Sequence, residues 1–267
     1  MANVLVSVVI PSYNCGAFLD DAVGSVLGQT YANLELVIVD DGSQDDSAAI
    51  VRTWQSKTDK IVYLKHEQNQ GLAAARNTGI RQARGELIAL LDADDVWLPD
   101  KLEVQLENMR QLDVDAVFSN WFVWDGVNKK LAYEFDVYRL FSGYDGLCAF
   151  IRHNFGNSST VLVKRSAFDT VGFFDETLSS GEDYDLWLRF LLKGLKLGFM
   201  PEALAYYRQH PAQMSVKLFN MRASRLAIFK RVARTRPSLL VTCPVLTKKL
   251  LTHQVYALAY KTLARRN

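Results

Sequence analysis

The chain has 267 residues, of which 49% are hydrophobic and 22% charged, so it is long enough for one large α/β domain or two smaller ones. This composition, with a net charge of only +2, excludes a disordered or fibrous protein, and no apolar run approaches the roughly 18 residues of a membrane span. The run at residues 4–10 lacks the basic leader of a signal peptide, and the three cysteines form no CxxC pair, so we expect a cytoplasmic protein with reduced cysteines.

Four apolar, β-branched runs within the first 112 residues are each followed by a polar loop and a helix-like stretch. This alternation predicts strands over residues 4–10, 34–39, 61–64 and 87–91 and helices over 16–27, 45–57, 72–83 and 99–112. Because the runs are apolar on both faces, the strands should form a mostly parallel sheet covered on both sides. Ser43 is the predicted cap of the second helix, with Asp46 as the acidic third position.

Polar or acidic residues follow three of these predicted strands. They are Pro11-Ser12-Tyr13-Asn14 after the first, Asp40-Asp41-Gly42-Ser43 after the second and Asp92-Ala93-Asp94-Asp95 after the fourth. In open parallel sheets, ligands bind where the carboxyl ends of the strands converge. We therefore expect a binding site at this edge of the sheet.

The second part of the chain has shorter predicted elements. Strands are predicted over 116–119, 160–163 and 196–200, with helices over 182–192, 219–232 and 245–263. The predicted organisation is one domain in two halves, over 1–112 and 113–215, followed by a basic helical extension over 216–267.

Three carboxylates within four residues, Asp92, Asp94 and Asp95, repel one another unless a cation lies between them. The alternative is a solvated acidic loop or a helix cap. An EF-hand is excluded because Val96 and Trp97 occupy loop positions that require an oxygen ligand and a glycine. No GxGxxG or GxxxxGK[ST] motif follows a strand, which removes dehydrogenases and P-loop proteins. The remaining hypothesis is Mg²⁺ or Mn²⁺ held by one or two carboxylates and by substrate phosphates.

Seven short motifs follow one another along the chain. They are residues 8–14 (VVIPSYN), 40–43 (DDGS), 71–80 (GLAAARNTGI), 92–94 (DAD), 171–175 (VGFFD), 181–189 (GEDYDLWLR) and 207–210 (YRQH). In order and spacing they resemble the motifs of inverting family 2 glycosyltransferases of the GT-A fold, and the resemblance covers about residues 4–215. It implies an α/β sheet of GT-A type and a nucleotide-sugar donor. Residues 1–112 would then form the nucleotide-sugar-binding half, and residues 113–215 the half that binds the acceptor and holds the catalytic base.

The resemblance also implies a role for individual residues. The residues that it implies for nucleotide-sugar binding are Pro11, Tyr13, Asn14, Asp41, Arg76, Asp92, Ala93 and Asp94. In similar enzymes the tyrosine stacks on the base and the second aspartate accepts a hydrogen bond from uracil, which implies a UDP-sugar. Asp92 would approach the ribose, while Asp94 and His210 would hold the Mn²⁺ or Mg²⁺ that bridges the diphosphate. The structural alternatives are a Tyr13 packed on Pro11, a surface arginine at position 76, and a histidine without a ligand.

Asp183 matches the general base of similar inverting enzymes, where it deprotonates the acceptor hydroxyl. The structural alternative is that Glu182, Asp183 and Asp185 form an acidic first turn that complements the helix dipole. Glu182, Asp95, Trp187 and Arg189 are expected to contact the acceptor or to support the site.

These expectations favour metal-assisted transfer of a sugar to a hydroxyl of a glycan or lipid-linked acceptor in polysaccharide biosynthesis at the cell envelope. Two alternatives remain. A polyprenyl-phosphate sugar synthase would need no base, because its acceptor is already an anion, and a binding module would hold the nucleotide sugar without catalysis. A nucleic-acid binder is disfavoured because no RNP-like or zinc-finger pattern is present.

Residues 216–267 contain 12 Lys and Arg and no Asp or Glu, whereas residues 1–215 contain 19 basic and 29 acidic residues. On the first predicted tail helix, one face carries apolar residues and basic residues flank it. The apolar face holds Leu218, Met221, Ile228, Phe229 and Val232. Either this face packs on the catalytic domain, or the helix binds an anionic membrane surface, which would place the protein on the inner face of the plasma membrane.

Overall fold

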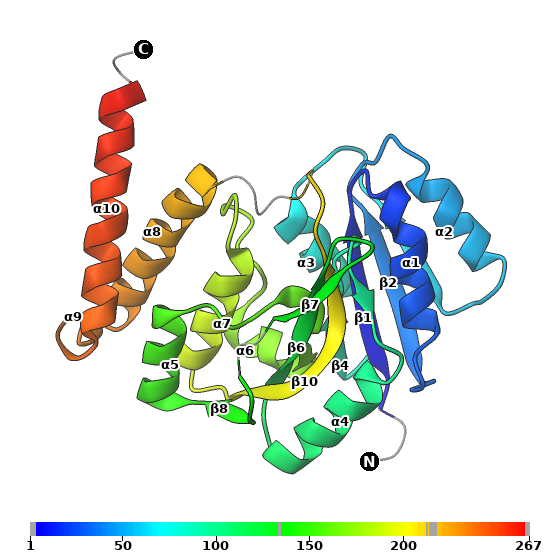
Figure 1. Cartoon of the computed structure of the whole chain (residues 1–267), viewed down its shortest axis with the longest axis horizontal. Helices are drawn as coiled ribbons and strands as arrows, with labels where there is room; N and C mark the ends of the chain where they lie inside the picture. Colours follow the sequence, from blue (N-terminus) through cyan, green and yellow to red (C-terminus); the bar gives the residue numbers. More distant parts are fainter. Residues whose placement is uncertain (1–3, 133–134, 212, 214–217, 265–267) are drawn as a thin grey trace.

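A mixed sheet, ten-stranded in the part of the chain that the structure describes, runs through the computed structural model with helices on both faces (Figure 1). The strand order is β3-β2-β1-β4-β9-β6-β10-β5, while β7 pairs with β6 and β8 with β10. The structure describes residues 4–132, 135–211, 213 and 218–264, without the side chains of 218–223 and 257–264. The predicted α/β class is confirmed.

The first nine elements contain the four predicted strands and the four predicted helices, with one unpredicted two-residue strand before the fourth helix. They are β1 (Val6–Ser12), α1 (Gly16–Leu27), β2 (Leu34–Asp40), α2 (Ser47–Gln55), β3 (Ile61–Lys65), α3 (Leu72–Gln82), β4 (Leu87–Leu90), β5 (Val96–Trp97) and α4 (Lys101–Leu112). Strands β3, β2, β1 and β4 are parallel neighbours, as expected from runs that are buried on both faces. The carboxyl ends of β1, β2 and β4 therefore share one edge of the sheet.

The second half of the sheet is mixed. It contains β6 (Ala116–Trp124), β7 (Lys129–Ala132), β8 (Arg139–Phe141), α5 (Gly143–Arg152), the 3₁₀ turn η1 (Ser158–Thr160), β9 (Leu162–Lys164), α6 (Arg165–Val171), α7 (Glu182–Leu192) and β10 (Leu197–Arg208). β9 lies antiparallel between β4 and β6, whereas β6 and β10 are parallel. One continuous sheet thus includes strands from both predicted halves of the domain.

Two predicted strand ends and one predicted cap are wrong. β1 continues past Ile10, because Pro11 still lies opposite Val39 of β2. β10 continues past Met200, the predicted end, to Arg208, and its pairing with β6 shifts register on both sides of Ala203. Ser43 does not cap α2, which starts at residue 47, and its hydroxyl instead accepts a hydrogen bond from the Asn14 amide.

The helices divide between the two faces of the sheet. Helices α1, α2 and α4 pack on one face, and α3 and α5 to α8 pack on the other. α3 lies so close to β1 that a Cβ added to Gly79 would come within 2.3 Å of the Val9 Cγ1 atom. Glycine at position 79 therefore permits the close packing of α3 on β1.

Three C-terminal helices confirm the predicted extension: α8 (Leu218–Thr235), α9 (Leu239–Thr242) and α10 (Pro244–Ala264). On α8, the side chains of Ile228, Phe229 and Val232 are at most 2% exposed and belong to the core that includes α5 and α7. These three side chains of α8 therefore pack on the domain that precedes the extension. The predicted members Leu218 and Met221 lie outside the described side chains. Within the described part of the chain, no helix is both long enough and apolar enough to cross a membrane.

Candidate active site

The loops after β1 and β2 are joined to each other at the sheet edge. The Asn14 amide donates to the Ser43 hydroxyl at 2.9 Å, and the Asn14 side-chain oxygen accepts from the Gln44 amide at 2.9 Å. Asn14 has a left-handed backbone (φ 52°), which asparagine tolerates better than most residues. Beside it, Tyr13 is 47% exposed, so its ring is available to a ligand.

Asp41 lies almost fully buried at the end of β2, and three donors already contact its carboxylate. These are the backbone amides of Gln70 and Gly71, at 2.9 and 2.8 Å, and the Nδ1 atom of His66 at 2.7 Å. A carboxylate has about four lone-pair sites, so about one remains for a ligand. Sequence reasoning missed His66, although its position directly after β3 puts it at the same edge as the predicted site.

Arg76 joins the strand edge to the second half of the domain. Its guanidinium donates to Asp92 and to Glu182, each at 2.6 Å, and its side chain is 2% exposed. The alternative of a surface arginine is therefore wrong. Burial acts against the charged form, but the charges of Asp92 and Glu182 outweigh burial and raise the pKa of Arg76. Arg76 is thus a permanent cation between the acidic motif after β4 and the start of α7.

Asp94 and His210 meet although 116 positions separate them. The His210 Nε2 atom lies 2.9 Å from the Asp94 carboxylate, and the imidazole also packs against Phe18. Burial and the nearby charge of Asp92 raise the pKa of Asp94. Among the described residues, no three His, Cys, Asp or Glu side chains gather as a complete metal site. The pair offers one carboxylate and one imidazole, which fits a divalent metal that also binds substrate oxygens.

Asp95 lies beneath this pair and faces the protein interior. It is 1% exposed and accepts hydrogen bonds from the Ser159 hydroxyl and from the Arg208 amide. Arg208 also donates to the backbone oxygen of Asp94 at 2.8 Å. Ala93, between the carboxylates, is buried as well. Asp95 is therefore placed to hold the loop in shape, and sequence reasoning assigned no such role to Arg208 or Ser159.

Asp183 occupies the first turn of α7, next to Glu182. Burial and the negative charge of Glu182 raise the pKa of Asp183 to about 7, although Arg76 opposes the change. A carboxyl with this pKa is a much stronger base than an ordinary aspartate, and about half of it is ionised at pH 7. The raised pKa of Asp183 therefore distinguishes the first turn of α7 from a simple acidic helix cap, which needs no raised pKa.

The rest of α7 is held firmly in the core. Trp187 is fully buried against Phe118, with 5.0 Å between the ring centroids. Arg189 donates to Asp185 at 2.8 Å and to the backbone oxygens of Val171 and Phe173, each at 2.7 Å. Trp187 is thus placed to support the helix from the core, and Arg189 ties Asp185 of the first turn to the segment before α7.

The extension also holds α7 through Arg231 of α8. Its guanidinium donates to Asp185 at 2.7 Å and also contacts Asp175. The Arg231 side chain is 38% exposed, whereas that of Asp185 is 2% exposed. Arg231, which lies in the extension, therefore neutralises the charge of two carboxylates that lie within residues 1–215.

We expect Arg231→Ala to lower the free energy of unfolding by about 2 kcal/mol, between the values typical of exposed and of buried ion pairs. Thermal unfolding measures this loss, which should lower the melting temperature by several degrees. Arg234→Ala is the matched control, because Arg234 is exposed on the same helix. Equal stability of the two variants would contradict a structural role for the Arg231 contacts.

Comparison with known proteins identifies relatives of this arrangement. Residues 7–172 match the model of the family described as Glycosyl transferase family 2. One relative is WfaP of Escherichia coli, named a UDP-Glc:α-D-GlcNAc-diphosphoundecaprenol β-1,3-glucosyltransferase. It is 32% identical over 217 residues, which cover 80% of this chain and 81% of WfaP.

Solved structures share the fold. TarS of Staphylococcus aureus, residues 1–349 in complex with UDP, superposes with a TM-score of 0.68 at 20% identity, covering 85% of this chain and 65% of that one. The mannosyltransferase PcManGT of Pyrobaculum calidifontis, in complex with GDP-Man and Mn²⁺, gives a TM-score of 0.67 at 19% identity, covering 95% and 75%. The predicted GT-A type of fold is thereby confirmed.

Proposed function

The chain belongs to glycosyltransferase family 2, and from this premise we propose that it moves a sugar from UDP to a hydroxyl of a glycan or lipid-linked acceptor, with inversion at the anomeric carbon. The observation that carries the proposal is the Arg76 bridge between Asp92 and Glu182. This bridge connects two parts of the site. Asp92 belongs to the acidic motif that would face the donor, and Glu182 belongs to the helix turn that would hold the base. Both halves of the reaction thus have their residues in one connected network.

The nucleotide would lie at the ends of β1 and β2. Tyr13 is exposed there and would stack on the base, an interaction that suits any base. The remaining lone pair of Asp41 would accept from the uracil N–H group, which gives directional selectivity. Asn14 would act mainly through its hydrogen bonds to the second loop, and Pro11 through its place in β1.

Asp94 and His210 would hold a divalent metal, with Asp92 beside them. When bound, the metal supplies positive charge that stabilises the leaving diphosphate. The mixed oxygen and nitrogen donor set favours Mn²⁺ over Mg²⁺. Arg208 and Asp95 would keep the Asp94 loop in position through their hydrogen bonds.

Asp183 would remove the proton of the acceptor hydroxyl as that oxygen attacks the anomeric carbon. Glu182 would not share this task, because its carboxylate is engaged by Arg76. Its negative charge instead helps to keep the Asp183 pKa high. A polyprenyl-phosphate synthase, whose acceptor carries no such proton, has no use for a base tuned in this way.

A lipid-linked glycan is the acceptor class that we propose. The name of WfaP states a sugar joined to undecaprenol through a diphosphate as its acceptor. A panel of UDP-, GDP- and other nucleotide sugars, tested with synthetic diphospholipid-linked sugars and scored for nucleotide release, tests donor and acceptor together. Release with UDP-sugars that requires a hydroxyl acceptor supports the proposal. Binding without any turnover across the panel contradicts it.

We expect UDP to bind at least about tenfold more tightly than GDP, because the carboxylate of Asp41 accepts from the uracil edge. Asp41→Asn keeps the size but loses the charge, so the difference should shrink. Tyr13→Ala is the contrasting control, since loss of stacking weakens the binding of UDP and GDP alike. Calorimetry measures the affinities of all three proteins for both nucleotides, and equal affinities of the unmodified protein for UDP and GDP would contradict the assignment.

The pH dependence of transfer should follow Asp183. Because its pKa is raised to about 7, the ionised base is lost as the pH falls, and kcat/KM should drop about tenfold per pH unit well below 7. Glu182→Gln removes one of the charges that raise this pKa, so the acid limb should shift to lower pH. Burial remains in the variant, so the shift is partial. An unchanged pH profile in Glu182→Gln would show that a group other than Asp183 determines the acid limb.

A further inference from the structure

Apolar side chains are unusually exposed on the last two helices. Eleven large hydrophobic residues are exposed among those that the structure describes, and five of them lie on α9 and α10. The five are Leu240, Val241, Leu251, Val255 and Tyr256. α9 and α10 form an outer edge of the molecule, with α8 between α10 and the sheet (Figure 1). The catalytic domain therefore does not cover them.

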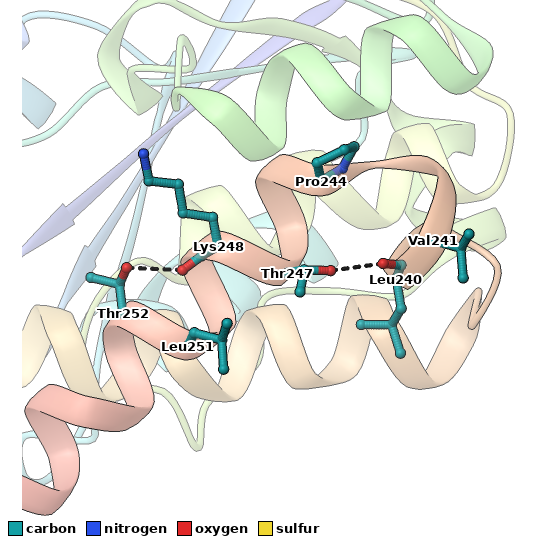
Figure 2. A pocket seen from close by; sticks show the side chains of 7 residues that line it. All are labelled: Leu240, Val241, Pro244, Thr247, Lys248, Leu251 and Thr252. Carbon is teal, nitrogen blue, oxygen red and sulfur yellow. Dashed lines mark hydrogen bonds between the residues drawn. The ribbon is translucent and has the colours of Figure 1, made fainter.

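The corner where α9 turns into α10 forms a shallow groove of about 430 Å³ (Figure 2). It is lined by Leu240, Val241, Pro244, Thr247, Lys248, Leu251 and Thr252. Both threonine hydroxyls are engaged with the backbone: Thr247 donates to the Leu240 oxygen and Thr252 to the Lys248 oxygen, each at 2.8 Å. The polar groups of the corner are thus satisfied internally, and its outer surface is largely aliphatic. We call these seven residues the α9–α10 corner.

The extension that contains the corner carries charge of one sign in its sequence. Residues 216–267 contain 12 cations and no carboxylate, and Lys248 lies within the corner itself. Among the extension cations whose side chains the structure describes, only Arg231 forms ion pairs, and its partners Asp175 and Asp185 precede the extension. An apolar surface that includes Lys248 and belongs to a cationic segment complements a surface that is anionic at its boundary and apolar beneath.

We propose that the α9–α10 corner binds the surface of an anionic phospholipid bilayer, with its aliphatic side chains in the interface and Lys248 against the headgroups. The apolar face of α8 plays no part, because it is buried in the core. A second copy of the chain is a less suitable partner, since two such extensions would bring cations against cations. The corner would keep the enzyme where lipid-linked acceptors are found.

Flotation of the full-length protein with vesicles tests the proposal. Phosphatidylglycerol vesicles should bind it at low salt and release it at high salt, and phosphatidylcholine vesicles should not bind it. The double variant Val241→Gln and Leu251→Gln should lower the affinity for anionic vesicles at least about tenfold. Val127→Gln and Lys130→Gln, two exposed positions at the β6–β7 hairpin, are the matched control and should bind normally.

Donor turnover in solution and thermal unfolding of each variant show whether it is folded, independently of any vesicle. If the unmodified protein ignores anionic vesicles at low salt, or if the corner and hairpin variants bind equally well, the proposal is wrong. Light scattering gives a third readout. A dimer that becomes monomeric in the corner variant while vesicle binding is unchanged would make the corner an interface between copies and would also overturn the proposal.

Discussion

Asp183→Asn should reduce transfer to a hydroxyl acceptor roughly a thousandfold while UDP binds with unchanged affinity. The amide has nearly the same shape but cannot accept the proton, and a positioned general base contributes about a hundredfold to ten-thousandfold. The loss should fall on kcat, because the proton moves only in the transition state. Single-turnover kinetics, together with calorimetry of UDP binding, measures the two effects separately.

The stability of the same variant provides a control. The pKa of Asp183 is higher in the folded protein than in the unfolded chain, so its ionisation destabilises the fold as the pH rises toward and through about 7. Asn carries no charge, so Asp183→Asn should be at least as stable as the unmodified protein at pH 8. An inactive variant that also unfolds early would have lost structure rather than a base. Substantial residual transfer would assign the proton to another group.

Removal of divalent metal should abolish transfer, and Mn²⁺ or Mg²⁺ should restore it. Asp94→Ala should cost at least about a hundredfold in turnover at saturating metal, the scale of losing several kcal/mol of charge stabilisation. His210→Ala should cost less, because the carboxylate keeps its charge near the diphosphate. Activity assays with EDTA and added metal test both expectations.

A matched control separates the metal ligand from the shape of its loop. Ser159→Ala removes a hydrogen bond to Asp95 without removing any carboxylate, so its effect should not depend on metal concentration. The loss in Asp94→Ala and His210→Ala should instead appear partly as a weaker apparent metal affinity. Full activity of the unmodified enzyme in excess chelator would eliminate the metal from the proposal.

The first half of the fold could be predicted well because local pattern determines it. Strands buried on both faces alternate there with amphipathic helices, and α1 begins and ends where the sequence pattern placed it. In the second half, α7 also begins and ends at the predicted residues. Elements such as β7, β8, α5 and α6 were missed. They are short, and β8 for example is three residues long with two of them exposed, so tertiary packing rather than local pattern decides their structure.

The candidate site was predictable in its residue types but not in its contacts. A strand end shows that Asp41 and Asp92 reach the same edge, yet nothing local shows that Asp41 accepts from the Gly71 amide. Likewise, the distance of 106 positions between Arg76 and Glu182 hides their ion pair from any sequence window. His66 could have been found by applying the strand-end argument to β3, whereas Ser159 carries no comparable signal.

The burial of the α8 side chains has a consequence for protein engineering. One way to recombine family 2 enzymes is to join the catalytic domain of one to the tail of another, but here the boundary near residue 215 does not separate two independent units. Ile228 and Phe229 complete the core beside α7, and Arg231 neutralises Asp175 and Asp185. A functional chimera must therefore exchange the segment from 171 to 192 together with α8, so that steric fit and charge balance come from the same parent.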